Sequence, residues 1–322
     1  MDFDLTPVQQ SWQQKGRALG RELEQDASAA DVVTGAAQAG LLDVGEDILS
    51  VVVALEALAS ESASAAAALA IHTAAMLAVA GDRHFHELPR GEAVGALTLS
   101  TESVPALDER TLSGCVSWVA PLTAHGVAVV AGRQGEERVA CAVRLDTAGV
   151  SIEDVRTAAL RGFVCGHLTL DRAPCVLIGP TRPVMSLARI FIAAAGIGMG
   201  RRAVRESLGS VRGTSRGAGG EQTVQGLVAD AATELDAAML LTWKAATTPL
   251  SLAAASMAKL AATGAAQRAL ERTTQIVGAD TFRHGHVIEQ LAQDVRALEL
   301  FAGRTEALRE AVACEDLPQP QS

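Results

Sequence analysis

The chain of 322 residues contains no tyrosine, and aromatic residues make up only 3% of it. Alanine fills many stretches instead. Because alanine has the highest helix propensity, an alanine-rich chain with so few aromatic residues favours helix. Basic residues are also outnumbered: 27 Lys and Arg against 37 Asp and Glu give a formal net charge of −10. Without a basic cluster, the sequence argues against nucleic acid or an anionic membrane as a partner.

Cysteine and histidine patterns that would indicate a metal site are missing. The five cysteines form no CxxC pair, and their odd number favours reduced, buried thiols over a disulfide framework. They are Cys115, Cys141, Cys165, Cys175 and Cys314. The seven histidines include two H-x-H pairs, but no cysteine or carboxylate cluster accompanies them. We therefore expect surface or packing histidines and no metal.

A membrane segment is not expected either. The longest apolar stretch, residues 190–199, is about half a membrane span and is broken by glycines. The N-terminus, Met1-Asp2-Phe3-Asp4, is acidic and no apolar segment follows it, unlike a signal peptide. These features predict a soluble, cytoplasmic protein with no membrane span.

The spacing of hydrophobic residues along the chain changes twice, and these changes divide the chain into three parts. Residues 7–90 follow a helical period, and a Thr6-Pro7 start provides an N-cap. Short β-branched runs punctuated by glycine occupy 94–178, which predicts a small antiparallel sheet. The helical period then returns, with long helices expected at 252–277 and 288–313. The predicted fold class is α+β, mainly α, with domains 1–92, 93–180 and 181–314 and a disordered tail at 315–322.

Two glycine-rich stretches need separate interpretation. The run Gly196-Ile197-Gly198-Met199-Gly200 superficially resembles a nucleotide loop, but no strand precedes it and the full GxGxxG spacing is absent. We interpret it as a stretch of close helix packing. Residues 213–220 are rich in Gly and Ser and are expected to form a mobile linker.

The C-terminal third carries several short patterns in a fixed order. Arg212 stands ten residues before Gln222, which begins a stretch ending at Asp230. The later patterns are Met257-Ala258-Lys259-Leu260, Gln275-Ile276-Val277-Gly278-Ala279 and Asp294-Val295-Arg296. In order and spacing they resemble the acyl-CoA dehydrogenase family, whose sequences run "FQxVQxxLAD", "MAKL", "QxxGGxG" and "RDxR" and then form an aromatic-Glu-Gly-Thr turn.

The resemblance extends over nearly the whole chain. Residues 112–118 resemble the family's "LNGxKxW", with Trp118 at the Trp place, and Ala96-Leu97-Thr98 resembles the start of "ALTE". Near the N-terminus, residues 39–42 and His72 also match. The resemblance implies a fold of helices, sheet and helices, which is the order that the periodicity indicates by itself.

FAD is the cofactor that the resemblance implies. Arg212 would pair with its pyrophosphate, Gln222 and Gln275 would offer amide hydrogen bonds, and Gly278 would let backbone approach closely. In the family the last of these contacts reach FAD bound in a neighbouring subunit. Trp118 would pack near the isoalloxazine ring. The alternatives are a core indole for Trp118, a solvated helix-end charge for Arg212 and a glycine-capped helix end at Gly278.

Thr98 is also carried over as a cofactor-binding position, but other flavin-side positions depart from the family pattern. Ala120 replaces a Thr, Ala279 a Gly and Arg304 a Thr, and the "PEEYGG" loop expected after Leu42 is missing. The missing loop would remove walls of the usual acyl pocket and widen it.

The largest departure concerns the catalytic base. In the family a glutamate at one of two positions removes the α-proton of the thioester, and a positioned general base contributes roughly 10²–10⁴-fold. Both positions hold alanine here, Ala302 and Ala188. Arg189 matches an arginine that the family places near the substrate, with a buried ion-pair or helix-face residue as the alternative. Glu299 and Glu306 flank the altered turn and are interpreted as solvated surface charges.

The leading hypothesis is a subunit of a heteromeric, FAD-dependent acyl-CoA dehydrogenase of the kind that some actinobacterial steroid side-chain enzymes suggest. A second acyl-CoA dehydrogenase-like subunit would supply the glutamate in a heterotetramer, and a homo-oligomer is the alternative assembly. The substrate would be a bulky, steroid-like acyl-CoA, and the acceptor an electron-transfer flavoprotein or a similar protein. Two alternatives remain: a non-catalytic scaffold on the same fold, and a stand-alone flavoenzyme of altered chemistry.

Overall fold

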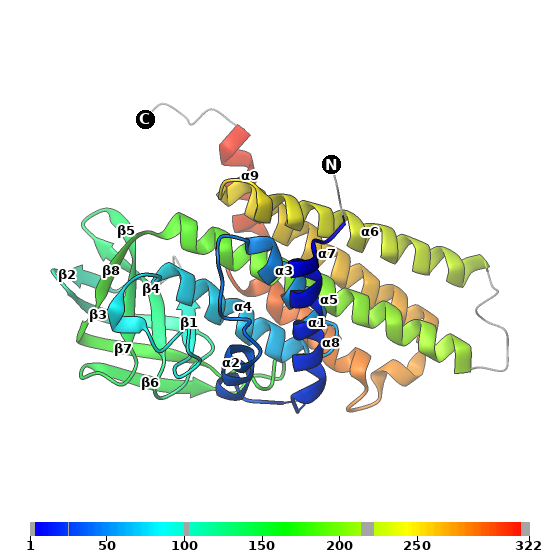
Figure 1. The fold of residues 1–322 in the computed structure, drawn as a ribbon, viewed down its shortest axis with the longest axis horizontal. Coiled ribbons are helices and arrows are strands. Elements are labelled where there is room, and N and C mark those ends of the chain that lie inside the picture. The colour runs from blue at the N-terminus through cyan, green and yellow to red at the C-terminus, as the bar shows by residue number, and fades with distance from the viewer. Residues whose placement is uncertain (1–3, 25, 100–102, 214–221, 317–322) are drawn as a thin grey trace.

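The computed structural model describes residues 4–24, 26–99, 103–213 and 222–316. Helices come first, an eight-stranded sheet follows, and long helices complete the chain (Figure 1). The α+β, mainly helical fold class predicted from the period is therefore confirmed.

The N-terminal helices are α1 (Pro7–Glu22), α2 (Ala29–Gln38), α3 (Ile48–Ala59) and α4 (Ala63–Ala78), followed by the 3₁₀ turn η1 (Arg83–Phe85). α1 starts as predicted: the Thr6 hydroxyl accepts from the Gln9 backbone N–H, and the Gln9 side chain accepts from Thr6 in return. α4 is buried on every side from Ala63 to Met76. A helix that is apolar all round is one enclosed by other elements, and α4 lies against α2, α3, α5 and β1.

The sheet comprises β1 (Gly95–Thr98), β2 (Ala106–Asp108), β3 (Thr111–Val119), β4 (Val127–Gln134), β5 (Glu137–Arg144), β6 (Val150–Val155), β7 (Cys165–Pro174) and β8 (Val176–Pro180). Its order is β6-β7-β3-β2-β4-β5-β8, and β1 also pairs with β4. The prediction of an antiparallel sheet is wrong for two pairs, because β1 and β2 both run parallel to β4. The β2–β3 hairpin intervenes between β1 and β4, so the chain returns to β4 in the direction of β1.

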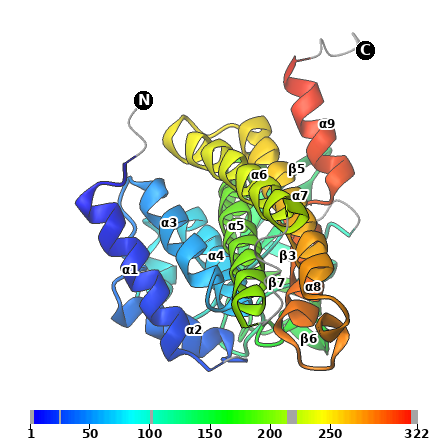
Figure 2. The ribbon, with the colours of Figure 1, turned by 90° about the vertical axis from the view of Figure 1, so that its right-hand side faces the viewer.

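The C-terminal helices are α5 (Thr181–Gly213), α6 (Gln222–Thr247), α7 (Leu252–Val277), α8 (Val287–Leu300) and α9 (Thr305–Asp316), with the 3₁₀ turn η3 (Ala279–Phe282) between α7 and α8. α5 is central: α3 and α4 pack on one side of it and α6, α7 and α8 on the other (Figure 2). Its length and apolarity would suffice to cross a membrane, but 83% of its most apolar window is buried inside the protein. We therefore describe α5 as the core helix of the bundle.

The glycine run within α5 is a packing feature, as the sequence indicated. A Cβ at Gly198 would lie 2.3 Å from the backbone oxygen of Glu56 on α3, and one at Gly200 would lie 2.6 Å from Leu235 on α6. Only glycine lets the two neighbouring helices approach α5 this closely.

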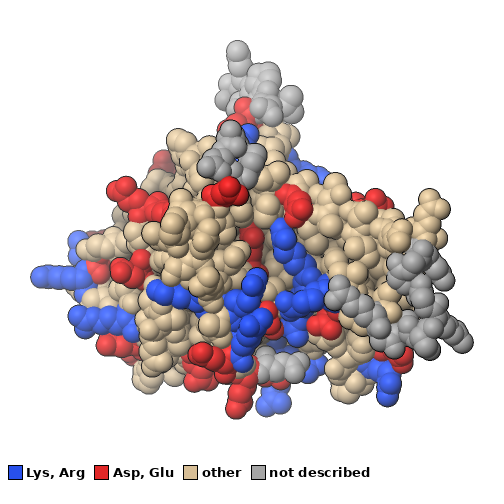
Figure 3. All heavy atoms as spheres, turned by 45° about the vertical axis from the view of Figure 1, so that its right-hand side comes forward, with Lys and Arg blue, Asp and Glu red and all other residues tan. Residues whose placement is uncertain are grey.

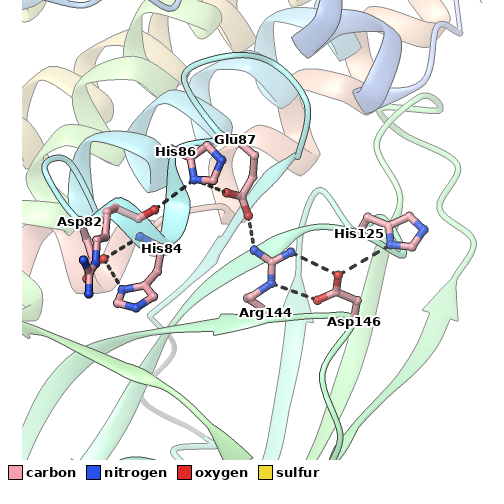
Figure 4. Close-up of polar contacts among 8 residues, drawn as sticks. Asp82, His84, His86, Glu87, His125, Arg144 and Asp146 are labelled. Carbon is pink, nitrogen blue, oxygen red and sulfur yellow. Dashed lines mark hydrogen bonds and ion pairs between the residues drawn. The ribbon is translucent and has the colours of Figure 1, made fainter.

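An ion-pair network joins the sheet to the segment after η1. Arg144 at the end of β5 contacts both Glu87 and Asp146, and His125 lies 3.8 Å from Asp146 (Figure 4). These pairs hold the pKa of Arg144 above its ordinary value and that of Asp146 below it, chiefly through their mutual hydrogen bonds. His72 adds a buried link, since its Nδ1 accepts from the Gly95 backbone N–H at 2.9 Å. This link bears out the expectation of a packing histidine.

Several local expectations are corrected. The helix predicted over 288–313 breaks between α8 and α9, because Ala302 and Gly303 take positive φ angles of 54° and 107°. The tail is helical to Asp316, so the predicted disorder from residue 315 begins too early. Residues 317–322 lie outside the described part of the chain, as does the predicted linker beyond Gly213. Finally, Cys115 and Cys314 are exposed, whereas the other three cysteines are buried as expected.

Candidate active site at the α8–α9 turn

The turn between α8 and α9 places Ala302 in the left-handed region of backbone space. Phe301 ends α8 in extended backbone, Ala302 follows at φ 54° and Gly303 at φ 107°. A positive φ is uncommon for a residue with a side chain and costs on the order of 1 kcal/mol. Such a conformation persists only where surrounding contacts hold it.

Arg189 connects the two alanine positions. It follows Ala188 on α5, and both residues are buried, at 5% and 1% exposure. The Arg189 Nε donates to the Ala302 carbonyl at 3.0 Å, and Nη1 donates to the Ser256 hydroxyl at 2.6 Å. Burial lowers the pKa of Arg189 to about 10. The fold thus brings both predicted base positions to one place, with a guanidinium between them.

Lys259 on α7 holds the same turn from the other side. Its ammonium donates to the carbonyls of Glu299 at 2.9 Å and Gly303 at 2.5 Å, and also to that of Phe301. The side chain has no exposed surface. Burial, and then the nearby charge of Arg189, lower the pKa of Lys259 to about 7, while Glu299 opposes the shift. Three carbonyl acceptors match the three N–H donors of an ammonium, so the geometry is that of the charged form.

The two glutamates beside the turn differ from each other. Glu299 accepts hydrogen bonds from Gln267 at 2.6 Å, Arg296 at 2.8 Å and Thr305 at 2.7 Å. Its pKa is lowered: burial alone would raise it, but these hydrogen bonds outweigh burial. Our interpretation of Glu299 as a solvated surface charge is therefore wrong. Glu306 does face solvent, where it forms a long ion pair with Arg304 at 3.9 Å.

Trp118 presents its indole to solvent at the end of β3. The residue is 55% exposed and has a φ of 58°, so the alternative of a core indole is wrong. His167 on β7 meets the indole edge-on, with ring centroids 5.7 Å apart. The Nδ1 of His167 is buried and has no hydrogen-bond partner among the described residues. The exposed indole ring of Trp118 therefore lies beside a histidine whose buried Nδ1 has no hydrogen-bond partner among the described residues.

Contacts connect the end of β3 to the alanine turn. Val119, next to Trp118, pairs with Gly166 on β7, and Leu122 donates its N–H to the Val164 carbonyl at 2.8 Å. Just before Val164, the Phe163 ring meets the Phe301 ring edge-on at 5.0 Å. The sheet and the C-terminal helices thus meet where the sequence expected the flavin ring and the missing base.

Thr98 lies close to the Trp118 end of β3. It is half-buried in β1, opposite Val130, and its neighbour Leu97 bridges to Ala120, two residues after Trp118. The remaining predicted cofactor residues lie elsewhere. Arg212 stands 24 residues after Ala188 on α5, which at 1.5 Å per residue is about 36 Å along the helix. The side chain of Arg212 lies outside the described part of the chain. Gln222 and Gln275 are exposed, and Gly278 caps the end of α7 with a φ of 83°. One subunit therefore does not bring Arg212 to the Trp118 end of the molecule.

Sequence reasoning missed the residues that support the turn. Lys259 lies within the Met257–Leu260 pattern that we noted, but the pattern did not indicate which backbone it would hold. Ser256 precedes that pattern, and Phe163 and His167 belong to no pattern that we used. The signal that was available is the type of residue: a lysine inside an apolar helical stripe must find acceptors, because an unpaired buried charge is expensive.

Comparisons with known proteins bear on the C-terminal region and on the fold. Residues 181–315, less than half of the chain, match the family model described as "Acyl-CoA dehydrogenase, C-terminal domain". The solved structure of butyryl-CoA dehydrogenase from Megasphaera elsdenii is similar over 99% of this chain and 100% of its own, with a TM-score of 0.88 at 17% identity. A structure described as a Tcur3481-Tcur3483 steroid ACAD variant is similar over 95% and 96% of the two chains, with a TM-score of 0.79 at 22% identity.

One curated relative carries a different activity in its name. The 3-sulfinopropanoyl-CoA desulfinase of Paraburkholderia xenovorans (strain LB400) is 26% identical over 269 residues, which cover 74% of this chain and 69% of the relative. Together the comparisons confirm the sequence resemblance for the C-terminal region and the fold for the whole chain.

Proposed function

We propose that this chain, whose residues 181–315 form an acyl-CoA dehydrogenase C-terminal domain, is a FAD-dependent subunit that dehydrogenates an acyl-CoA thioester together with a partner subunit. The observation that supports the proposal most directly is that the turn between α8 and α9 is held in place although it contains no glutamate that could act as the catalytic base. Arg189 and Lys259 still hold the turn in place, yet Ala302 and Ala188 offer only methyl groups. Because a methyl group cannot accept a proton, a glutamate must come from elsewhere.

FAD fits the residues that are present. Trp118 offers an exposed flat ring, and the unpartnered His167 Nδ1 beside it offers a hydrogen bond to a polar ring edge. A Cβ built at Gly278 would meet nothing within 4 Å, so its backbone is open to a second molecule. Arg212 stands about 36 Å along α5 from Ala188, and the side chains of Gln222 and Gln275 face outward. We therefore assign them to FAD bound by a neighbouring subunit.

The roles of this chain's own residues follow from their contacts. Bound FAD would supply the acceptor for the β-hydride. Trp118 would bind one face of the ring, and the Phe163–Phe301 contact would keep the sheet and the turn together around it. The Nε and Nη1 of Arg189 already donate to the Ala302 carbonyl and to the Ser256 hydroxyl. Arg189 therefore orients the backbone of the turn and is not free to transfer a proton.

The proposal also covers the partner subunit and the substrate. The similar structure named as a steroid enzyme carries two designations, Tcur3481 and Tcur3483, in its description, which favours a heteromeric assembly for this chain as well. A bulky, steroid-like CoA thioester suits a chain that lacks the loop expected after Leu42. An electron-transfer flavoprotein or a similar protein would accept the electrons, and the cytoplasm is the expected compartment.

A second candidate function is hydrolytic desulfination without net oxidation. The curated relative named as a desulfinase acts on a sulfinate-bearing CoA thioester, according to its name. In this reaction a carbon–hydrogen bond replaces the carbon–sulfur bond, and water supplies that hydrogen and the third oxygen of the released sulfite. No α-proton is removed, so a site that lacks both glutamates is compatible with it. This candidate is the altered-chemistry alternative of the sequence analysis.

The test is purification of the chain alone and together with a candidate partner, an acyl-CoA dehydrogenase subunit that carries the catalytic glutamate, followed by flavin absorbance and turnover. We expect FAD in the complex, and dye reduction by saturated acyl-CoA only there. Arg212→Ala should lower flavin affinity about tenfold, since one charge-assisted contact is lost, while Arg309→Ala should not. A complex without flavin absorbance would contradict the proposal. Sulfite release from 3-sulfinopropanoyl-CoA without dye reduction would favour the second candidate.

A further inference from the structure

A polar cavity of about 200 Å³ lies farther along α5 from the alanine turn. The end of α1 and the residues after it, the turn between α3 and α4, the segment at Arg161, α5 and α8 line it. The lining residues that matter here are Glu61, Ser62, Arg161, Arg202, Gln290 and Asp294. Arg202 follows Ala188 by 14 residues on α5, so about 20 Å of helix separates this cavity from the candidate active site.

Two buried polar atoms in this lining have no partner among the described residues, namely Nε of Arg202 and Oε1 of Gln290. The other ends of both side chains are fixed. Arg202 Nη1 donates to the Glu61 carbonyl, and Gln290 Nε2 donates to Asp294 Oδ1 at 2.8 Å. Leaving a buried donor or acceptor unpaired costs about 1–3 kcal/mol, so each atom is expected to meet a group that enters the cavity.

The cavity is lined by two guanidinium groups, those of Arg161 and Arg202, and by the carboxyl groups of Asp26, Glu61 and Asp294. Arg161 is exposed and forms no ion pair within the described residues. Around Glu61, Arg21 approaches at 3.7 Å and Arg205 at 3.3 Å, and Arg205 also donates to the Ser60 carbonyl. Basic side chains gather in the middle of the face drawn in Figure 3, with acidic side chains beside them. The carboxylate of Glu61 is thus outnumbered by the guanidinium groups near it.

The carboxyl group of Asp294 does not oppose an anion strongly. It accepts from the Leu160 backbone N–H at 2.6 Å and from Gln290, so its oxygens are already engaged. Burial raises its pKa, against the lesser effects of these two hydrogen bonds and of the nearby charges of Arg161 and Arg202. The hydrogen-bonding groups that the cavity offers to a ligand are therefore guanidinium donors on one side and one amide oxygen acceptor on another.

We propose that this cavity binds a phosphate group, held by Arg161 and Arg202 and donating one O–H to Oε1 of Gln290. Guanidinium groups bind tetrahedral oxyanions through charge-assisted hydrogen bonds. A hydrogen phosphate carries both the negative oxygens for the arginines and the hydroxyl for the amide oxygen. Sulfate has the same shape and charge but carries no proton at neutral pH, so it lacks the third contact.

Calorimetric titration of the purified chain with inorganic phosphate tests the proposal. We expect saturable binding with a Kd on the order of 1 mM, and weaker binding of sulfate. Arg161→Met, at an exposed side chain, should raise the phosphate Kd about tenfold. Gln290→Met should abolish the preference of phosphate over sulfate, and Arg309→Met on α9 serves as the matched control without effect.

The source of the phosphate is distinguished by a second titration with glycerol phosphate, a small monoester that keeps one titratable hydroxyl. Tighter binding of the monoester assigns the site to a phosphorylated metabolite, and tighter binding of inorganic phosphate assigns it to the free ion. Absence of saturable binding by either, or equal binding by wild type and Arg161→Met, overturns the proposal and leaves a cavity filled by water alone.

Discussion

The ammonium of Lys259 donates to the backbone carbonyl of Glu299 at 2.9 Å, across 40 residues of sequence. Through this contact and its two companions at Phe301 and Gly303, α7 holds the end of α8 and the turn that follows. None of the three acceptors is a side chain. The turn therefore keeps its shape whether residue 302 is a glutamate or an alanine, which explains how the base could be lost without loss of the fold.

Replacing Lys259 tests this dependence. Lys259→Met keeps the length and apolar stem of the side chain but leaves three carbonyls without their donor. We expect the free energy of unfolding to fall by about 3 kcal/mol, because buried acceptors are costly to leave unpaired. Urea denaturation at pH 6, where the lysine is charged, measures the loss. Lys244→Met, at an exposed position on α6, is the control, and equal stability of the two variants would contradict the role given to Lys259.

Glu56 predicts a stability that depends on pH. This carboxyl on α3 is fully buried, and its Oε1 accepts from Trp243 Nε1 at 3.1 Å. Burial raises its pKa to about 7, against the lesser opposing effects of Arg201 and the Trp243 hydrogen bond, while Asp236 adds to the rise. Between pH 4.5 and 7 the folded state binds more protons than the unfolded state. The free energy of unfolding must therefore fall as pH rises through this range.

The matching experiment compares wild type with Glu56→Gln at pH 5 and pH 8. The amide keeps an acceptor for Trp243 but does not ionise. Relative to wild type, the variant should gain about 3 kcal/mol between the two pH values. Glu310→Gln, at an exposed position on α9, should follow wild type at both. A constant difference between Glu56→Gln and wild type would show that this carboxyl does not titrate in the range.

The fold was predictable from sequence wherever a regular period dominated it. The helical period located α7 at its observed bounds, and the Thr6-Pro7 start marked the beginning of α1. The break after Leu300 was not predictable, because residues 288–313 are rich in good helix formers and only the positive φ of Ala302 and Gly303 interrupts them. The contacts from Lys259 that stabilise this break are long-range, and helix propensity reflects only local sequence.

The candidate site was only half predictable for a similar reason. The family resemblance located Ala302, Ala188 and Trp118 by number, but their surroundings depend on long-range contacts. Asp294 illustrates this, since it accepts from Leu160 across 134 residues. The cavity that contains Arg202 and Gln290 is assembled from five separate segments. No spacing in the sequence links those segments.

Apolar side chains exposed on the C-terminal helices predict an oligomer. Leu240 and Leu241 on α6, Leu250 after it and Met257 on α7 are 39–47% exposed. Burying such groups contributes about 25 cal/mol per Å², which favours self-association or binding of a partner subunit through this face. Light scattering should report a species larger than a monomer at micromolar concentration. Leu241→Glu should shift it toward the monomer, whereas Val8→Glu on α1, a more exposed apolar site, should not.

The central prediction concerns turnover. The purified chain should not dehydrogenate acyl-CoA, whereas the complex with a glutamate-bearing partner should. Replacing that partner glutamate by glutamine should lower the rate at least about 100-fold, the lower end of the contribution of a general base. Dye reduction under saturating acyl-CoA measures both rates. Ferricyanide-type dyes are suitable acceptors because they bypass the natural electron acceptor.

Glu299 and Glu306 provide the control within this chain. Glu299 already accepts from Gln267, Arg296 and Thr305, so its carboxylate is not free to remove a proton, and Glu306 faces solvent. Glu299→Gln and Glu306→Gln should therefore leave turnover of the complex nearly unchanged. If the isolated chain turns over instead and loses its activity on Glu299→Gln, the base has moved within this chain. The requirement for a partner glutamate would then fall, although the hydrogen bonds that lower the pKa of Glu299 make it a weaker base.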